Sequence, residues 1–144
     1  MSNLWNLNDL KANDAIVVPG ETMSAMFWNA AAQRADQVFL RQKEFGLWRQ
    51  WTWAQTAQAV REIGDGLLSL GLAPGEVVAI LSNTIVEWVL ADLAVLSCGA
   101  VCNGIYPTDS SSQAQFLCED SATCILFVED DEQLDKALEV RSRL

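Results

Sequence analysis

Histidine is absent from all 144 residues, which removes the commonest partner for several kinds of catalysis and metal binding. A serine or cysteine nucleophile usually needs a histidine base to take its proton. The four cysteines, Cys98, Cys102, Cys118 and Cys124, form no CxxC pair, so their spacing fits neither a structural zinc site nor a redox motif. Because each lies in an apolar run, we expect core thiols, with no metal site and no catalytic cysteine.

Positive charge is missing from the middle of the chain. No Lys or Arg occurs between Arg61 and Lys136, and the formal net charge is −10. Such a field repels polyanions, so nucleic acid is not an expected partner. The same field argues that the phosphates of a ligand are not held chiefly by these side chains.

Long apolar runs are missing as well. The longest, residues 85–100, is interrupted by Glu87 and Asp92 and is shorter than the ~20 residues that cross a bilayer. Residues 1–10 lack the basic start and apolar run of a secretory signal. We therefore expect no transmembrane helix and a cytoplasmic location.

A glycine-rich phosphate loop at the start of a helix is also missing. Gly64 and Gly66 lie inside an expected helix, where close packing is the better interpretation. The strand at residues 77–81 is followed by Ser-Asn-Thr, without the glycines of a dinucleotide fingerprint. The acidic pairs at 119–120 and 129–130 mark helix ends or loops. No self-sufficient active site follows from these patterns.

Apolar residues make up 51% of the chain, enough for the core of one domain. Their spacing predicts a first helix over residues 22–35. Two β-prone runs, 38–42 and 47–53, predict a hairpin with Gly46 at the turn. Trp48, Trp51 and Trp53 fall there, and we interpret them as closing one end of the core rather than as a ligand face or membrane contact.

The rest of the chain alternates between strand and helix patterns. Possible capping boxes at Thr52/Gln55 and Thr84/Glu87 open two helices. The expected elements after the hairpin are a helix from 52 to Gly71, a strand at 77–81, a helix from 84 to Gly99, a strand at 100–105, a helix opening at 110–112, a strand at 124–128 and a helix from 131. This order predicts an α/β fold with a parallel sheet of at least three strands, flanking helices and an N-terminal β-hairpin.

The expected domain organisation is an N-terminal arm over residues 1–20 and a first α/β portion over residues 21–144. The last helical pattern reaches Leu144 without a Gly or Pro to end it. A domain boundary usually lies in a polar linker. We therefore expect a truncated chain.

Six segments of the sequence carry a resemblance to a known family. They are residues 45–54 (FGLWRQWTWA), 70–83 (LGLAPGEVVAILSN), 87–94 (EWVLADLA), 99–101 (GAV), 104–108 (GIYPT) and 126–130 (LFVED). In this order they resemble the start of bacterial long-chain fatty acid–CoA ligases, which belong to the AMP-forming, adenylate-forming superfamily of acyl-CoA synthetases. The resemblance covers about residues 22–144, and no single segment is a catalytic signature. It implies that this chain is part of the large N-terminal domain of such an enzyme.

The resemblance implies a complete protein that activates a fatty acid with ATP and Mg²⁺ to acyl-AMP and passes the acyl group to CoA. The family's phosphate loop, adenylate contacts and catalytic Lys would lie beyond Leu144, so no catalytic, cofactor-binding or metal residue is transferred. The chain by itself is expected to be inactive. The resemblance also allows peripheral contact with the inner membrane and a homodimer, although the sequence does not decide the oligomeric state.

One ligand-facing loop is a candidate within the chain. Tyr106, Pro107 and Thr108 follow an expected parallel strand at its carboxyl end, where α/β folds tend to bind ligands. A structural turn fixed by Pro107 is the competing interpretation. Two other readings of the whole chain stay open: a non-enzymatic α/β interaction module, and an AMP-forming ligase for another carboxylic acid.

Overall fold

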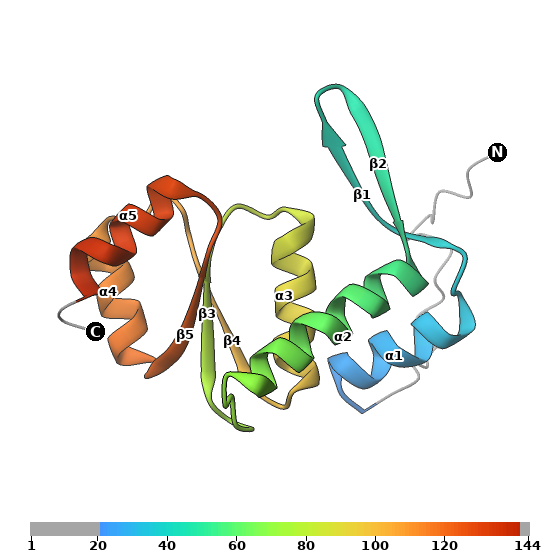
Figure 1. Cartoon of the computed structure of the whole chain (residues 1–144), viewed down its shortest axis with the longest axis horizontal. Coiled ribbons are helices and arrows are strands. Elements are labelled where there is room, and N and C mark those ends of the chain that lie inside the picture. The colour runs from blue at the N-terminus through green and yellow to red at the C-terminus, as the bar shows by residue number, and fades with distance from the viewer. Residues whose placement is uncertain (1–20, 142–144) are drawn as a thin grey trace, which may run out of the picture.

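The computed structural model describes residues 21–141, which form three layers (Figure 1). A small sheet stands in the middle, with helices against both of its faces. A separate β-hairpin projects from one side. The predicted arm at residues 1–20 lies outside the described residues.

The central sheet contains the strands β3 (Val77–Leu81), β4 (Val101–Ile105) and β5 (Thr123–Val128) in the order β4-β3-β5. Both pairings are parallel. Residues 78–81 of β3 are buried, as the continuous apolar run of this strand predicts. The parallel sheet and its flanking helices confirm the predicted fold class.

The two faces of the sheet are covered by different helices. The helices α2 (Trp53–Ser69) and α3 (Val86–Ser97) pack on the face that Val78 presents, with α1 (Met23–Gln33) outside them. The helices α4 (Ser111–Asp120) and α5 (Asp131–Val140) lie on the opposite side (Figure 1). There Ala114 and Cys118 contact the face formed by Ala79 and Leu81. Alternate residues of β3 thus belong to two core clusters.

The hairpin pairs β1 (Val38–Glu44) with β2 (Leu47–Thr52) in antiparallel register. Phe45 and Gly46 form its turn, with φ of 47° and 82°. Positive φ at both central residues is the geometry whose twist matches two antiparallel strands. Gly46 therefore lies at the turn, as predicted.

Helix starts agree with the sequence in most places. Thr22 caps α1, and Thr52 and Gln55 form the predicted capping box of α2. A second capping box, formed by Ser110 and Gln113, opens α4.

The predicted box of Thr84 and Glu87 is wrong. Helix α3 begins after Ile85, which provides no side-chain cap. A turn closed by the Ile85 N–H and the Asn83 carbonyl (2.9 Å) leaves Thr84 outside the helix start. The amide of Val86 instead donates to Oε1 of Gln42 on the hairpin (2.7 Å). This contact spans 44 positions, so a local pattern could not indicate it.

Three further expectations need correction. Cys124 is exposed rather than a core thiol, because the pairing of β5 with β3 skips from Thr123 to Ile125 and leaves residue 124 bulged. Trp48 is 64% exposed, so it closes no core, whereas Trp51 and Trp53 do pack against the larger cluster. Gly64 is buried beside Cys98, as close helix packing requires, but Gly66 faces open space.

Candidate functional site

Parallel strands bring three loops to one edge of the sheet, which we call the carboxyl edge. Leu81, Ile105 and Val128 end their strands in matching register. The loops that follow, residues 82–85, 106–110 and 129–130, define this edge. The carboxyl ends of parallel strands are where ligands enter most open α/β sheets.

The candidate ligand-facing loop, residues 106–108, lies at this edge, and its backbone is hydrogen-bonded to α5. Tyr106 is 75% exposed, Thr108 is exposed and Pro107 is half-buried. The Asp109 N–H donates to the Tyr106 carbonyl (3.0 Å), which closes a turn. Nζ of Lys136, on α5, donates to the Pro107 carbonyl (2.6 Å). The backbone is thus fixed while two hydroxyl side chains point outward.

Lys136 is itself positioned by α5. Its ammonium also donates to Gln133 Oε1 (3.1 Å) and lies 3.3 Å from the Glu132 carboxylate. Gln133 is buried, with 4% of its surface exposed. Within residues 21–141, neither the Tyr106 nor the Thr108 hydroxyl has a hydrogen-bond partner, so both can donate to a ligand.

Glu129 connects the other two loops. Its Oε2 accepts hydrogen bonds from the Asn83 N–H (2.6 Å), Asn83 Nδ2 (3.0 Å) and Ser82 Oγ (3.2 Å). Its own N–H donates to the Leu81 carbonyl (3.2 Å). Asp130 caps α5, so the acidic pair does mark a helix end as predicted, but the clamp made by Glu129 was not foreseen.

A cleft of about 490 Å³ opens beside Glu129, between the ends of β3 and β5 and the start of α3. Glu87 and Glu129 contribute its carboxylates, Gln42 its amide, and Trp88 and Phe127 its aromatic walls. Trp88 also covers β4, because a Cβ at Gly104 would lie 3.5 Å from its Cζ2 atom. Two carboxylates in the wall disfavour a phosphate group, and an apolar or uncharged ligand suits this cleft better.

These additional residues left only a faint signal in the sequence. Ser82, Asn83 and Glu129 lie within two residues of the ends of parallel strands, as Tyr106 does, and that shared position could have grouped them at one edge. Gln42 lies in the hairpin, and nothing local connects it with the sheet.

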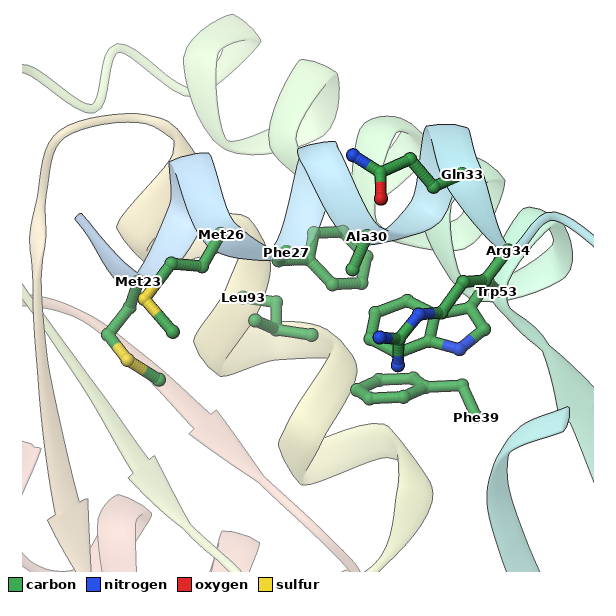
Figure 2. A pocket seen from close by; sticks show the side chains of 9 residues that line it. All are labelled: Met23, Met26, Phe27, Ala30, Gln33, Arg34, Phe39, Trp53 and Leu93. Carbon is green, nitrogen blue, oxygen red and sulfur yellow. The ribbon is translucent and has the colours of Figure 1, made fainter. Parts of the chain in front are cut away.

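A second cavity, of about 320 Å³, lies between α1, the base of the hairpin and α3 (Figure 2). Its wall is mainly apolar, with Gln33 and Arg34 as polar members. Phe39 and Trp53 stack with ring centroids 3.9 Å apart, and Phe27 lies 5.9 Å from Trp53. The aromatic rings join α1 to the hairpin and α2, so this cavity belongs to the scaffold.

Thiol chemistry is suppressed in three of the four cysteines. Burial, followed by the hydrogen bond and negative charge of Asp92, raises the pKa of Cys102 to about 12. Burial also raises the pKa of Cys98 and of Cys118. These thiols remain protonated near neutral pH and are poor nucleophiles. Over residues 21–141 no three His, Cys, Asp or Glu side chains gather where they could hold a metal ion.

No helix among the described residues has the length and apolar character needed to cross a membrane.

Comparison with known proteins places these features in context. The model of the AMP-binding enzyme family matches residues 27–144. A long-chain-fatty-acid–CoA ligase of Mycobacterium bovis is 35% identical over 111 residues, which are 77% of this chain and 18% of that protein. A mouse long-chain-fatty-acid–CoA ligase is 32% identical over 117 residues, or 81% of this chain and 18% of the mouse protein. The chain thus spans about a fifth of the length of the curated relatives it matches.

Solved structures share the fold. The anthranilate CoA ligase AuaEII, in complex with anthranoyl-AMP, superposes with a TM-score of 0.75 at 24% identity and covers 82% of this chain and 22% of its own. The N-terminal domain of FACL13 from Mycobacterium tuberculosis gives a TM-score of 0.75 at 20% identity, over 83% of this chain and 29% of its own. At these identities the likeness concerns the fold alone.

Proposed function

The chain belongs to the AMP-binding enzyme family, and on that premise we propose that it forms part of a long-chain fatty acid–CoA ligase. The family match over residues 27–144 carries this proposal. The choice of acid is supported by the two curated ligases described above, from a bacterium and a mammal, which are both named for long-chain fatty acids.

The proposed reaction has two steps. The carboxylate of the fatty acid attacks ATP, pyrophosphate leaves, and the thiol of CoA then displaces AMP from the acyl adenylate. ATP would supply the leaving group that makes the carboxylate attackable, and Mg²⁺ would accompany its phosphates.

The described residues at the carboxyl edge do not fit the role of holding the nucleotide or the metal. The only Lys or Arg between positions 62 and 140 is Lys136, whose ammonium is already engaged with Pro107, Gln133 and Glu132. The cleft at the carboxyl edge is lined by two carboxylates. We therefore assign no step of the chemistry to these side chains and propose that residues 21–141 supply the scaffold.

Tyr106, Pro107 and Thr108 remain our proposed ligand-facing loop. Support comes from their place at the carboxyl edge and from the outward hydroxyls of Tyr106 and Thr108. In the proposed enzyme these hydroxyls position a substrate group and do not take part in bond breaking.

Measurement of pyrophosphate release tests the proposal. The 144-residue chain and the product of the uninterrupted reading frame would each be mixed with palmitate, ATP, Mg²⁺ and CoA. We expect turnover only with the latter. Turnover by the 144-residue chain alone would show that the chemistry lies within it, contrary to the proposal.

The same assay separates the alternatives. Activity of the reading-frame product with an aromatic acid but not with palmitate would identify a ligase for another acid. A reading frame that ends near residue 144, with no activity in any mixture, would favour an interaction module.

We also propose that the enzyme works in the cytoplasm as a peripheral protein at the inner membrane, where its fatty acid substrate partitions. A homodimer is compatible with this location. Sedimentation of the reading-frame product would measure its oligomeric state directly.

A further inference from the structure

The tip of the hairpin exposes large apolar side chains to solvent. Phe45 is fully exposed, and Leu47 and Trp48 are 74% and 64% exposed. Toward its base, the hairpin packs Phe39, Leu40 and Trp51 against the larger core cluster. In Figure 1 the tip extends well away from the helical layers. The hairpin therefore has an anchored base and a projecting apolar end.

The turn places Phe45 in a conformation that folding alone would not select. Its φ of 47° lies in the left-handed region. Asn, Asp and Gly are preferred at this position of a two-residue hairpin turn, and a bulky side chain is disfavoured there. The exposed ring gains no packing in return. A strained, exposed aromatic residue of this kind points to a role outside the fold.

Positive charge accompanies the apolar tip. Arg41, Lys43 and Arg49 all lie on the hairpin, in a chain with a net charge of −10. Arg49 pairs with Glu44 (2.9 Å), but Arg41 and Lys43 form no ion pair within residues 21–141. Lys43 lies opposite Trp48 in the strand register. Because side chains alternate along a strand, Arg41, Lys43 and Trp48 share one face of the hairpin.

Exposed aromatic and aliphatic side chains next to unpaired cations suit the surface of an anionic bilayer. Tryptophan prefers the level of the headgroups, apolar side chains enter the acyl boundary, and Lys and Arg attract anionic lipids. A narrow convex tip offers little of the ~800 Å² per partner that a standard protein interface buries.

We propose that residues 45–48 insert into an anionic lipid surface, with Arg41 and Lys43 against the headgroups. The proposal assigns the membrane contact of the peripheral enzyme to the hairpin. It rests on the proposed function, which supplies the reason for the enzyme to meet a membrane.

Co-sedimentation with lipid vesicles tests the proposal on the product of the uninterrupted reading frame. Vesicles of phosphatidylethanolamine and phosphatidylglycerol should bind the protein, and vesicles of phosphatidylcholine alone should bind it weakly. Phe45→Asn should weaken binding at least about tenfold, because a buried phenyl ring is lost. Lys43→Gln should weaken it about fivefold at low salt.

Matched controls separate insertion from unfolding. Asn suits the turn, so Phe45→Asn should keep the circular dichroism spectrum of the parent. Phe116→Gln, at a ring 63% exposed on α4, and Arg141→Gln, at an exposed cation, should bind vesicles like the parent.

Three results would overturn the proposal: no binding of the parent to anionic vesicles, equal binding by Phe45→Asn, or a dimer of the parent that Phe45→Asn dissociates while vesicle binding is unchanged. The last would assign the tip to a second copy of the chain. Ligase activity on dispersed fatty acid is a separate readout, so failure of the proposed reaction and failure of this contact are distinguishable.

Discussion

Tyr106 and Thr108 present hydroxyls at the carboxyl edge, while the backbone between them is held by Lys136. Because both side chains are exposed, Tyr106→Ala and Thr108→Ala should change the free energy of unfolding by less than about 0.5 kcal/mol. If the loop contacts substrate, each should lower kcat/KM of the active reading-frame product about tenfold.

The matched control for this loop is Tyr106→Phe, which keeps the ring and removes the hydroxyl. An effect of Tyr106→Phe equal to that of Tyr106→Ala would assign the contact to the hydroxyl. Unchanged kcat/KM in all three variants would leave the loop as a structural turn fixed by Pro107.

We expect the thiols of Cys124 and Cys102 to react with alkylating reagents at very different rates. Cys124 is exposed in its bulge, whereas burial and Asp92 raise the pKa of Cys102 to about 12. At pH 8 iodoacetamide should label Cys124 first and leave Cys102 unmodified in the native protein, as followed by peptide mass spectrometry. Cys124→Ser should remove the fast phase, and comparable labelling of Cys102 in the native state would contradict the assignment.

The raised pKa of Cys102 also makes the stability of the fold depend on pH. The unfolded thiol ionises near its ordinary value of 9.0, and the folded thiol ionises near 12. The contribution of this group to stability is therefore complete below pH 9.0 and is lost as pH rises toward 12.

At the element scale, helix α3 takes its cap from the hairpin rather than from its own sequence. Gln42→Ala should lower the free energy of unfolding by about 0.5–2 kcal/mol, because the Val86 amide loses its acceptor. Thr84→Ala should change it by less than about 0.5 kcal/mol, since Thr84 caps nothing. Urea unfolding measures both changes. A larger loss of stability in Thr84→Ala than in Gln42→Ala would contradict this assignment and support the capping box that the sequence predicts.

The difference between these two helix starts shows how far local patterns reach. Thr52 and Gln55 are three residues apart and satisfy each other, so their box is readable from the sequence and present in the structure. Thr84 and Glu87 have the same spacing but form no box. The turn that ends at Ile85 shifts the helix start, and the side chain of the distant Gln42 accepts the Val86 N–H. Sequence predicts the elements because their causes are local, and it misses contacts such as Gln42 with Val86 because they depend on the finished packing.

The carboxyl edge illustrates the same limit for the candidate site. Residues 106–108 were recognisable because they follow a strand directly. The clamp of Glu129 on Ser82 and Asn83 requires β5 to lie next to β3, and the order β4-β3-β5 does not follow from the order of elements along the chain.

At the scale of the whole molecule, strand β3 connects two cores. Val78 belongs to the larger cluster with α2 and α3, and Leu81 belongs to the smaller one with α4. Since both residues lie on one five-residue strand, loss of β3 removes support from both helical layers at once. We therefore expect the layers to unfold in one cooperative transition.

Two probes can follow the layers separately in urea. Fluorescence in a Trp5→Phe background reports the larger cluster and the hairpin, because the other tryptophans lie on α1, β2, α2 and α3: Trp28, Trp48, Trp51, Trp53 and Trp88. Labelling of the buried Cys118 thiol reports the smaller cluster. The two urea midpoints should coincide.

Leu81→Ala, at a fully buried position, should lower the free energy of unfolding by about 2–5 kcal/mol and move both midpoints together. If Leu81→Ala advanced only the Cys118 midpoint, α4 and α5 would unfold as a separate unit, and β3 would not couple the two faces of the sheet.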